Sequence, residues 1–338
     1  MSVAIIGTRG TGKSTLVGLL QQSMEKFTNE YPEKLAYFMD SNTTRVCLEN
    51  IRNPLLSKSF PVSTVRGDFE KLSFLIGFEA KRRDKIKYLT KKFSMTRMRD
   101  IFDNYDNMMI LTVLDVSGED VEEFGRHPRI TEIIKSIFIS NILVVLVDTS
   151  KFTRELNGKD FQRMQAYDAE MAKILSAYEG YRAKNMPGEI LHPVVFFTKM
   201  DMLDKEILNR LDNHKDLDMN KNDMYKDYRE DDVQKDGTRL LREYLPGVAA
   251  NLTGSRNVKV PMHEAKFYFS WVGLEKEEGM QSADAGLMVD RYETINGDEL
   301  KTNVYPMGHY RAFIKKLSEL SHDYSDRESL VKEYLDRD

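Results

Sequence analysis

The hydrophobic positions along the chain alternate between short runs typical of strands and longer helical patterns. Residues 3–6 form an apolar run, and after a glycine-rich turn the apolar residues recur at helical spacing: Leu16, Leu19, Leu20, Met24 and Phe27. Runs at 108–116 and 142–147 are rich in Val, Ile and Leu without strict alternation, which is typical of strands buried on both faces. The chain is therefore predicted to begin with a strand, a loop and a helix.

The same alternation continues through the rest of the chain. The predicted elements are a crossover helix at 130–139, an amphipathic helix at 161–178, a buried strand at 194–197, a helix at 240–252, a strand at 267–272 and a C-terminal helix at 309–321. Strands that alternate with helices in this way indicate an α/β fold, with a mostly parallel sheet and helices on both faces.

Four stretches do not fit the minimal alternation. Three of them are predicted to be helical or irregular insertions into a single domain that spans 1–338, and they cover about 28–61, 81–107 and 204–235. The fourth, 287–305, has Asn296 and Gly297 between flanking residues of strand character, which predicts a β-hairpin.

Composition narrows the class of protein. The chain has 338 residues, of which 41% are hydrophobic and 31% charged, which is ordinary for a globular protein. The net charge of −4 excludes a general attraction to nucleic acid or to an anionic membrane, and the single cysteine, Cys47, excludes an internal disulfide framework. The N-terminus lacks a signal-peptide pattern, and the most apolar stretch, 137–147, is too short to span a bilayer, so we expect a cytoplasmic protein.

A phosphate-binding motif lies at the first predicted turn. Residues 7–14 read Gly-Thr-Arg-Gly-Thr-Gly-Lys-Ser and match G-x-x-x-x-G-K-[ST] between a strand and a helix. Glycines let backbone N–H groups approach phosphate oxygens, and the helix adds its positive N-terminal end. Lys13 is predicted to contact the β- and γ-phosphates, and Ser14 to offer its hydroxyl to Mg²⁺. The predicted nucleotide-binding residues of this segment are Gly7, Arg9, Gly10, Thr11, Gly12, Lys13, Ser14 and Thr15.

Two further segments make the chain resemble the Ras-like branch of the P-loop GTPases. Residues 115–118, Asp-Val-Ser-Gly, end a buried strand and match the family's D-x-x-G element. Residues 198–201, Thr-Lys-Met-Asp, follow the next strand and look like the N-K-x-D element that reads guanine. The resemblance implies a three-layer P-loop NTPase fold of the G-domain type, GTP or GDP as ligand, and Mg²⁺ as cofactor.

The resemblance also implies roles for single residues. Asp115 would hold Mg²⁺ through water, and the N–H of Gly118 would contact the γ-phosphate. The carboxylate of Asp201 can accept both the ring N–H and the exocyclic amine of guanine, a pair that adenine does not offer. Lys199 can lay its alkyl stem over the base. Thr198 replaces the family's Asn, whose amide tethers this loop to the phosphate loop, so weaker or less selective binding is expected; a solvated turn is the alternative.

The remaining elements of the family match less well. Ser270 and Trp271 follow a late strand where the family has S-A-K, so Ser270 is predicted to support the base through its hydroxyl or the adjoining backbone, while Trp271 fits the core equally well. Thr64 is the preferred first-switch threonine, with a hydroxyl for Mg²⁺, and Thr43 and Thr44 are alternatives.

The position after D-x-x-G carries Glu119, where the family usually has a glutamine that orients the attacking water. A carboxylate can accept the proton of this water, but it brings negative charge towards the γ-phosphate. We therefore predict slow intrinsic hydrolysis, raised by a partner or by a cation supplied in cis, for which Arg9 and Arg66 are the nearest candidates. The predicted catalytic residues are Lys13, Thr64 and Glu119.

The sequence thus predicts a Mg²⁺-dependent GTPase that acts as a molecular switch and binds a protein effector or regulator. A P-loop ATPase or kinase-like enzyme and a pseudo-GTPase that only holds nucleotide are the alternatives. The basic stretch at 81–99 is a candidate contact for an acidic partner or a membrane surface, although a solvated helix face is the simpler interpretation. The acidic balance and the lack of a recognisable module argue against nucleic acid.

Overall fold

The computed structural model describes the greater part of the chain. The described residues are 3–31, 34–39, 69–80, 105–116, 135, 140–212, 228–253, 260–275, 286–288, 290–295, 298–303 and 305–324. The basic stretch at 81–99 and, apart from Lys135, the predicted crossover helix at 130–139 lie outside them.

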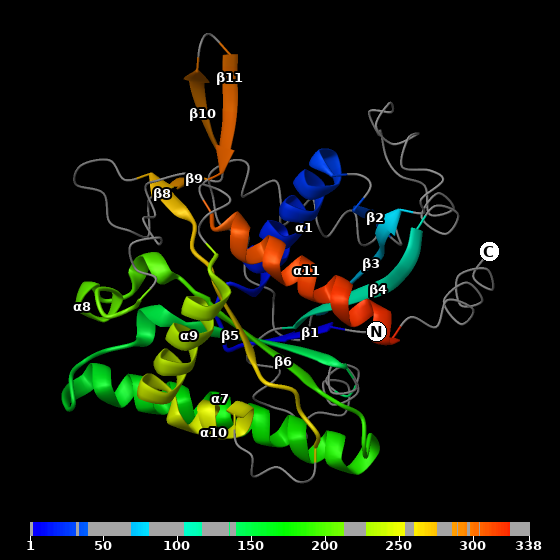
Figure 1. The fold of residues 1–338 in the computed structure, drawn as a ribbon. Helices are drawn as coiled ribbons and strands as arrows, with labels where there is room; N and C mark the ends of the chain where they lie inside the picture. Colours follow the sequence, from blue (N-terminus) through cyan, green and yellow to red (C-terminus); the bar gives the residue numbers. More distant parts are fainter. Residues whose placement is uncertain are drawn as a thin grey trace.

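Within the described ranges, strands and helices alternate along the chain (Figure 1). The elements are β1 (Val3–Ile6), α1 (Lys13–Glu30), β2 (Leu35–Met39), β3 (Phe69–Ala80), β4 (Tyr105–Val116), β5 (Ile142–Asp148), η1 (Thr149–Lys151), α7 (Gly158–Asn185), β6 (His192–Thr198), η2 (Met200–Met202), α8 (Lys205–Leu208), α9 (Glu230–Tyr244), α10 (Pro246–Thr253), β7 (Lys266–Phe269), β8 (Gly273–Glu275), β9 (Gly286–Met288), β10 (Asp290–Ile295), β11 (Asp298–Asn303) and α11 (Met307–Tyr324).

The central sheet is parallel and has the strand order β1-β5-β6-β7. Every residue of β1, β5 and β6 is buried, as continuous apolar runs require when both faces of a sheet are covered. Because the carboxyl ends of parallel strands share one edge, the segments after these three strands meet there. The α/β class with a parallel central sheet is therefore confirmed.

Helices cover both faces of this sheet. Alternate strand residues such as Val145 and Phe197 face α7, α9 and α10, and their neighbours Val144 and Phe196 face α1 and α11. Figure 1 shows the two groups of helices on opposite sides of the strands. This arrangement is the three-layer architecture that the helical and strand periods predict.

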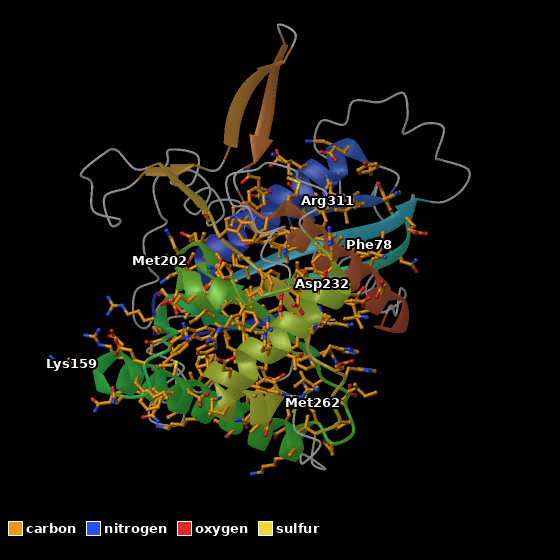
Figure 2. The ribbon with its side chains drawn as sticks, turned by 60° about the vertical axis from the view of Figure 1, so that its left-hand side comes forward. Phe78, Lys159, Met202, Asp232, Met262 and Arg311 are labelled. Carbon is orange, nitrogen blue, oxygen red and sulfur yellow. The ribbon has the colours of Figure 1, made fainter. Side chains whose placement is uncertain are left out.

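The outer helix α11 packs against α1 through the shared core, and Arg311 adds a contact at their surface. The guanidinium of Arg311 lies 5.4 Å from the centre of the Phe27 ring and pairs with the carboxylate of Glu30 (Figure 2). The C-terminal helix thereby covers the helix that follows the phosphate loop.

A second, antiparallel sheet with the order β2-β3-β4 lies beside β1 through β4. The apolar run at 108–116 forms a strand as predicted, and this strand pairs antiparallel with β3. An apolar run shows that a strand is buried and carries no information about its direction. Met108 and Met109, adjacent in β4, are both buried, so the predicted burial on both faces is present.

The helical pattern at 240–252 is divided between α9 and α10, a difference from the single predicted helix. Pro246 has no N–H to continue the first helix and suits the first position of the next one. The carboxylate of Asp168 on α7 accepts hydrogen bonds from the N–H groups of Gly247, at 2.8 Å, and Val248, at 3.0 Å. The new helix start is thus satisfied by a side chain from a neighbouring helix.

The stretches predicted as insertions contain regular structure where they are described. Strand β2 falls within 28–61, and α8 and the first turns of α9 fall within 204–235. Around Asn296 and Gly297, β10 and β11 pair antiparallel, with Ile295 opposite Asp298, at the position of the predicted hairpin.

Candidate functional site

The turn between β1 and α1 has the backbone that its glycines allow. Gly10 and Gly12 have φ values of 74° and 85°, a left-handed conformation that side chains strain, and Gly12 is the N-cap of α1. A Cβ on Gly7 would lie 2.6 Å from Thr11 Oγ1 and 3.2 Å from the Cβ of Leu146 on β5. Gly10 and Gly12 are therefore required by their positive φ angles, and Gly7 is required because Thr11 and Leu146 lie too close for a side chain.

A nearly buried cation lies against this turn. Lys13 is 9% exposed, and its Nζ donates to the carbonyl oxygens of Gly7, at 2.9 Å, and Thr8, at 3.2 Å. The hydroxyl of Thr11 donates to the same Thr8 carbonyl at 2.9 Å. The loop thus folds around the ammonium group of Lys13, beside the N-terminal end of a helix, which is an arrangement that suits an anion.

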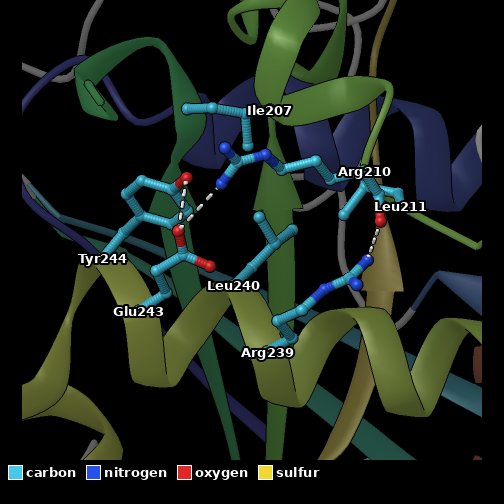
Figure 3. Close-up of a pocket in the computed structure, with 7 residues that line it drawn as sticks. All are labelled: Ile207, Arg210, Leu211, Arg239, Leu240, Glu243 and Tyr244. Atoms are coloured by element: carbon cyan, nitrogen blue, oxygen red, sulfur yellow. Dashed lines mark hydrogen bonds and ion pairs between the residues drawn. The ribbon is translucent and has the colours of Figure 1, made fainter.

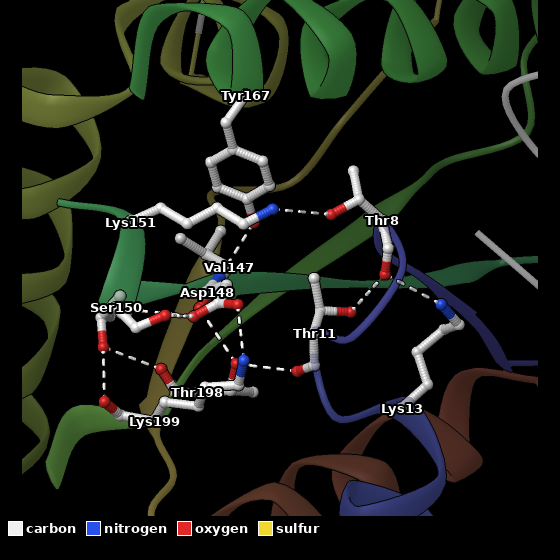
Figure 4. Close-up of polar contacts among 11 residues, drawn as sticks. Thr8, Thr11, Lys13, Val147, Asp148, Ser150, Lys151, Tyr167, Thr198 and Lys199 are labelled. Carbon is white, nitrogen blue, oxygen red and sulfur yellow. Dashed lines mark hydrogen bonds and ion pairs between the residues drawn. The ribbon is translucent and has the colours of Figure 1, made fainter. Parts of the chain in front are cut away.

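The segment predicted to read the base is tied directly to the phosphate loop. Thr198 is the last residue of β6, and its hydroxyl lies 2.9 Å from the carbonyl oxygen of Thr11 and 3.3 Å from that of Val147 (Figure 4). The expected loss of the tether at this Thr-for-Asn position is therefore wrong. A hydroxyl suffices because the parallel strands place the end of β6 within hydrogen-bond reach of the loop.

A second set of contacts fixes the backbone of the same segment. The hydroxyl of Thr149 donates to the carbonyls of Thr198, at 2.8 Å, and Lys199, at 2.9 Å. Lys199 has a φ of 57°, and its ammonium pairs with the carboxylate of Asp148 at 2.8 Å. The Asp148 side chain is only 3% exposed, so this ion pair is shielded from water on one side. The ammonium of Lys199 is thus committed to a partner that the sequence did not predict.

Asp148 and Thr149 are the site residues that sequence reasoning missed. The carboxylate of Asp148 also accepts from the N–H of Ser150, at 3.1 Å, and from its hydroxyl, at 2.6 Å, which turns the chain into η1 directly after β5. One signal was present: both residues follow a buried parallel strand, whose carboxyl end is where ligands of such sheets bind.

Removing the tether at Thr198 should weaken nucleotide binding without unfolding the protein. Valine keeps the shape of threonine but cannot donate, so Thr198→Val should lower the affinity for GTP and GDP alike by about 3- to 10-fold, the value of one hydrogen bond. Thr198→Ser keeps the hydroxyl and serves as the control. Fluorescent-nucleotide titration measures both variants, and equal affinity of Thr198→Val and the wild type would contradict the role of the tether.

The residues predicted to contact the base differ in accessibility. Asp201 lies in η2 and is exposed. Ser270 is buried, its hydroxyl is 2.8 Å from that of Tyr310 on α11, and its carbonyl accepts from the N–H of Met200 at 3.2 Å. The hydroxyl predicted to support the base is therefore occupied within the core, while the backbone of Ser270 does adjoin the base segment. Trp271, 6% exposed, is a core residue that packs against His309.

The predicted metal ligands are only partly placed. Ser14 lies in the first turn of α1, and Asp115 is the penultimate residue of β4, where its backbone pairs with Glu70. The other predicted switch and catalytic residues lie outside the described ranges: Thr43, Thr44, Thr64, Arg66, Gly118 and Glu119. Two further residues were predicted to bind nucleotide from the phosphate-loop segment: Arg9 is exposed and Thr15 is half-buried. Among the described residues no cluster of three or more His, Cys, Asp and Glu side chains could hold a metal.

A separate hollow of about 350 Å³ lies between α8 and α9 (Figure 3). Its charged groups already have partners: Arg210 lies 3.7 Å from Glu243, and Arg239 is 2.7 Å from the buried carboxylate of Asp236. This hollow is therefore a weaker candidate for an anion than the phosphate loop, where the ammonium of Lys13 lies against backbone carbonyl groups at a helix N-terminus.

Fold and site together define an α/β protein whose parallel sheet carries the glycine-rich loop at 7–14 and a second loop joined to it by Thr198. No protein-family model and no curated protein matches the chain. One similar solved structure is the signal recognition particle receptor SRb-GTP/SRX complex from Chaetomium thermophilum, at 12% identity and a TM-score of 0.32, covering 80% of this chain and 93% of that one. The likeness is too weak to support an inference about ligand or partner. No helix in the described part of the chain is long and apolar enough to cross a membrane.

Proposed function

We propose that this protein binds guanine nucleotides with Mg²⁺ and is a GTPase that acts as a molecular switch. The observation that carries the proposal is the hydrogen bond from Thr198 to Thr11, which joins two motif segments 187 residues apart in the sequence. The contact places both motif segments at the carboxyl edge of the parallel sheet, where ligands of such sheets bind. Their junction gives one site with a phosphate end at the loop and a base end at Asp201.

The base would be selected by Asp201. Its carboxylate is exposed in η2, next to a backbone that Thr149 and Ser270 hold from two sides. A carboxylate on a fixed backbone can accept both the ring N–H and the exocyclic amine of guanine, and adenine would leave its charge unmatched. Guanine is therefore the base that this end of the site suits best.

The phosphates would lie against Lys13 and the N–H groups of Gly10 to Ser14, with Mg²⁺ held by Ser14 and, through water, by Asp115. Hydroxyl and carboxylate oxygens are the ligands that this ion prefers, and Ser14 directly follows the lysine that lines the loop. When bound, Mg²⁺ would offset negative charge on the phosphate oxygens. The assignments of Thr64, Gly118 and Glu119 remain sequence-based parts of the proposal.

Slow intrinsic hydrolysis is part of this proposal, since Glu119 would bring negative charge near the γ-phosphate. A slow rate is also what a switch needs, because a protein partner can then read the triphosphate state before it is lost. A single-turnover rate of seconds or faster in the isolated protein would contradict this part of the proposal.

Nucleotide titration tests the central proposal. The purified chain is titrated with fluorescent GTP, GDP and ATP in the presence and absence of Mg²⁺. We expect GTP and GDP to bind more tightly than ATP, and Mg²⁺ to strengthen the binding of GTP. A preference for ATP would favour a P-loop ATPase or kinase-like enzyme. Equal affinity for GDP and the imido analogue of GTP, with unchanged protease sensitivity, would favour a pseudo-GTPase.

A further inference from the structure

A second lysine reaches the phosphate loop from a different part of the chain. Lys151 is the last residue of η1, the short turn that the Asp148 carboxylate caps after β5. Its ammonium lies 3.5 Å from the hydroxyl of Thr8, a residue of the phosphate loop that is 2% exposed. The contact brings a cation from residue 151 to the loop at residue 8.

A buried tyrosine holds this lysine in place. The ammonium of Lys151 lies 4.1 Å from the centre of the Tyr167 ring, and Figure 4 shows its side chain extending past this ring towards Thr8. Tyr167 is itself fixed, because its hydroxyl accepts from the N–H of Asp148 at 2.9 Å. Burial raises the pKa of the Tyr167 hydroxyl, so the ring stays neutral and does not cancel the charge of the lysine.

The charge of Lys151 is not neutralised by a carboxylate in the part of the chain that the structure describes. The carboxylate at its own strand end, Asp148, pairs with Lys199 instead. Lys13 contacts the carbonyl of Thr8 while Lys151 contacts its hydroxyl, so two ammonium groups meet at one residue of the loop. Two ammonium groups in contact with one residue repel each other, and an anion bound beside them would offset that repulsion. The loop therefore favours a ligand with more negative charge.

The position of Lys151 along the loop indicates which phosphate it would meet. The base segment is attached at Thr11, through Thr198. The ammonium groups of Lys13 and Lys151 both contact Thr8. Because the motif lysine, Lys13, is predicted to contact the β- and γ-phosphates, a second cation at the same loop residue would lie near the last phosphates of a bound nucleotide.

We propose that Lys151 binds the terminal phosphate of the triphosphate beside Lys13, and so makes the protein prefer GTP to GDP. The inference rests on the proposed function and adds to it a specificity residue.

The test compares the two nucleotides in the full chain with Mg²⁺. Lys151→Met should weaken binding of the imido analogue of GTP by about 10- to 100-fold, the value of one charge-assisted contact, and change GDP binding by less than about threefold. Lys151→Arg keeps the charge and should retain most of the preference. Lys159→Met, at an exposed position in the first turn of α7, is the matched control and should bind both nucleotides as the wild type does (Figure 2).

The outcomes separate this inference from the proposed function. An equal loss for both nucleotides would show that Lys151 only supports the loop, and unchanged affinities would show that it does not meet the ligand; either result overturns the inference alone. Wild-type protein that binds neither nucleotide would overturn the proposed function as well. If Lys151→Met does not fold, Lys151→Gln provides the same comparison with a polar side chain of similar length.

Discussion

Replacing Lys13 by alanine should lower the affinity of the protein for both GTP and GDP by about 100-fold or more. The side chain is nearly buried and its ammonium is held against the carbonyls of Gly7 and Thr8. Lys151 contacts the hydroxyl of Thr8 and not these carbonyls, so it does not replace Lys13 there. Lys13→Ala would lose charge-assisted contacts to two phosphates, each worth about 1.5–3 kcal/mol, and this accounts for the expected fall in affinity.

Titration with fluorescent nucleotides measures the effect of Lys13→Ala, and thermal unfolding shows whether the variant is folded. Lys159→Ala is the control for loss of a lysine at an exposed position. A folded Lys13→Ala protein that binds GTP within about threefold of the wild type would remove the phosphate loop from the proposed site. The comparison with Lys151→Met is informative, since Lys13→Ala should affect GTP and GDP alike, while Lys151→Met should affect mainly the triphosphate.

Replacing Asp201 by asparagine should change the preferred base from guanine to xanthine. The amide of asparagine can accept only one of the two guanine hydrogens and would turn a donor towards the other, so GTP affinity should fall by about 100-fold or more. Xanthine carries a carbonyl where guanine has its amine, and the asparagine N–H₂ can donate to it. Affinity for xanthosine triphosphate should therefore rise in the same variant.

Competition between the two triphosphates for one fluorescent nucleotide measures this exchange. Asp231→Asn, at an exposed position in the first turn of α9, is the control for loss of a carboxylate. A decrease in GTP affinity without any gain for xanthosine triphosphate would point to a disturbed loop. An unchanged preference for guanine would show that Asp201 does not read the base, even if the protein binds nucleotide.

The order of elements was predictable because the period of apolar residues reflects burial directly. The structure contains the predicted strand at 3–6, the helix after it and the buried strands at 142–147 and 194–197. The last two strands each extend by one polar residue beyond the predicted end, to Asp148 and Thr198. Those added residues are site residues. Periodicity ends where side chains become polar, and in a parallel sheet that is the edge where a ligand site forms.

Two features of the fold were not readable from the pattern. The antiparallel pairing of β4 depends on which neighbour it meets, and burial of its residues is the same in either direction. The start of α10 after Pro246 has its N–H groups bonded to Asp168, a residue of another helix that the apolar pattern does not identify.

The sequence by itself determined the phosphate loop, because the glycines, Lys13 and Ser14 are local requirements of a turn that leads into a helix. It also indicated the base segment, since Lys and Asp at a strand end are a local pattern. Only the tertiary structure decided how these segments are joined. The Thr198 hydroxyl replaces the tether expected to be lost, Asp148 takes the ammonium of Lys199, and Lys151 meets Thr8. Each contact links residues far apart in the chain, and their distance in space is set by the packing of parallel strands.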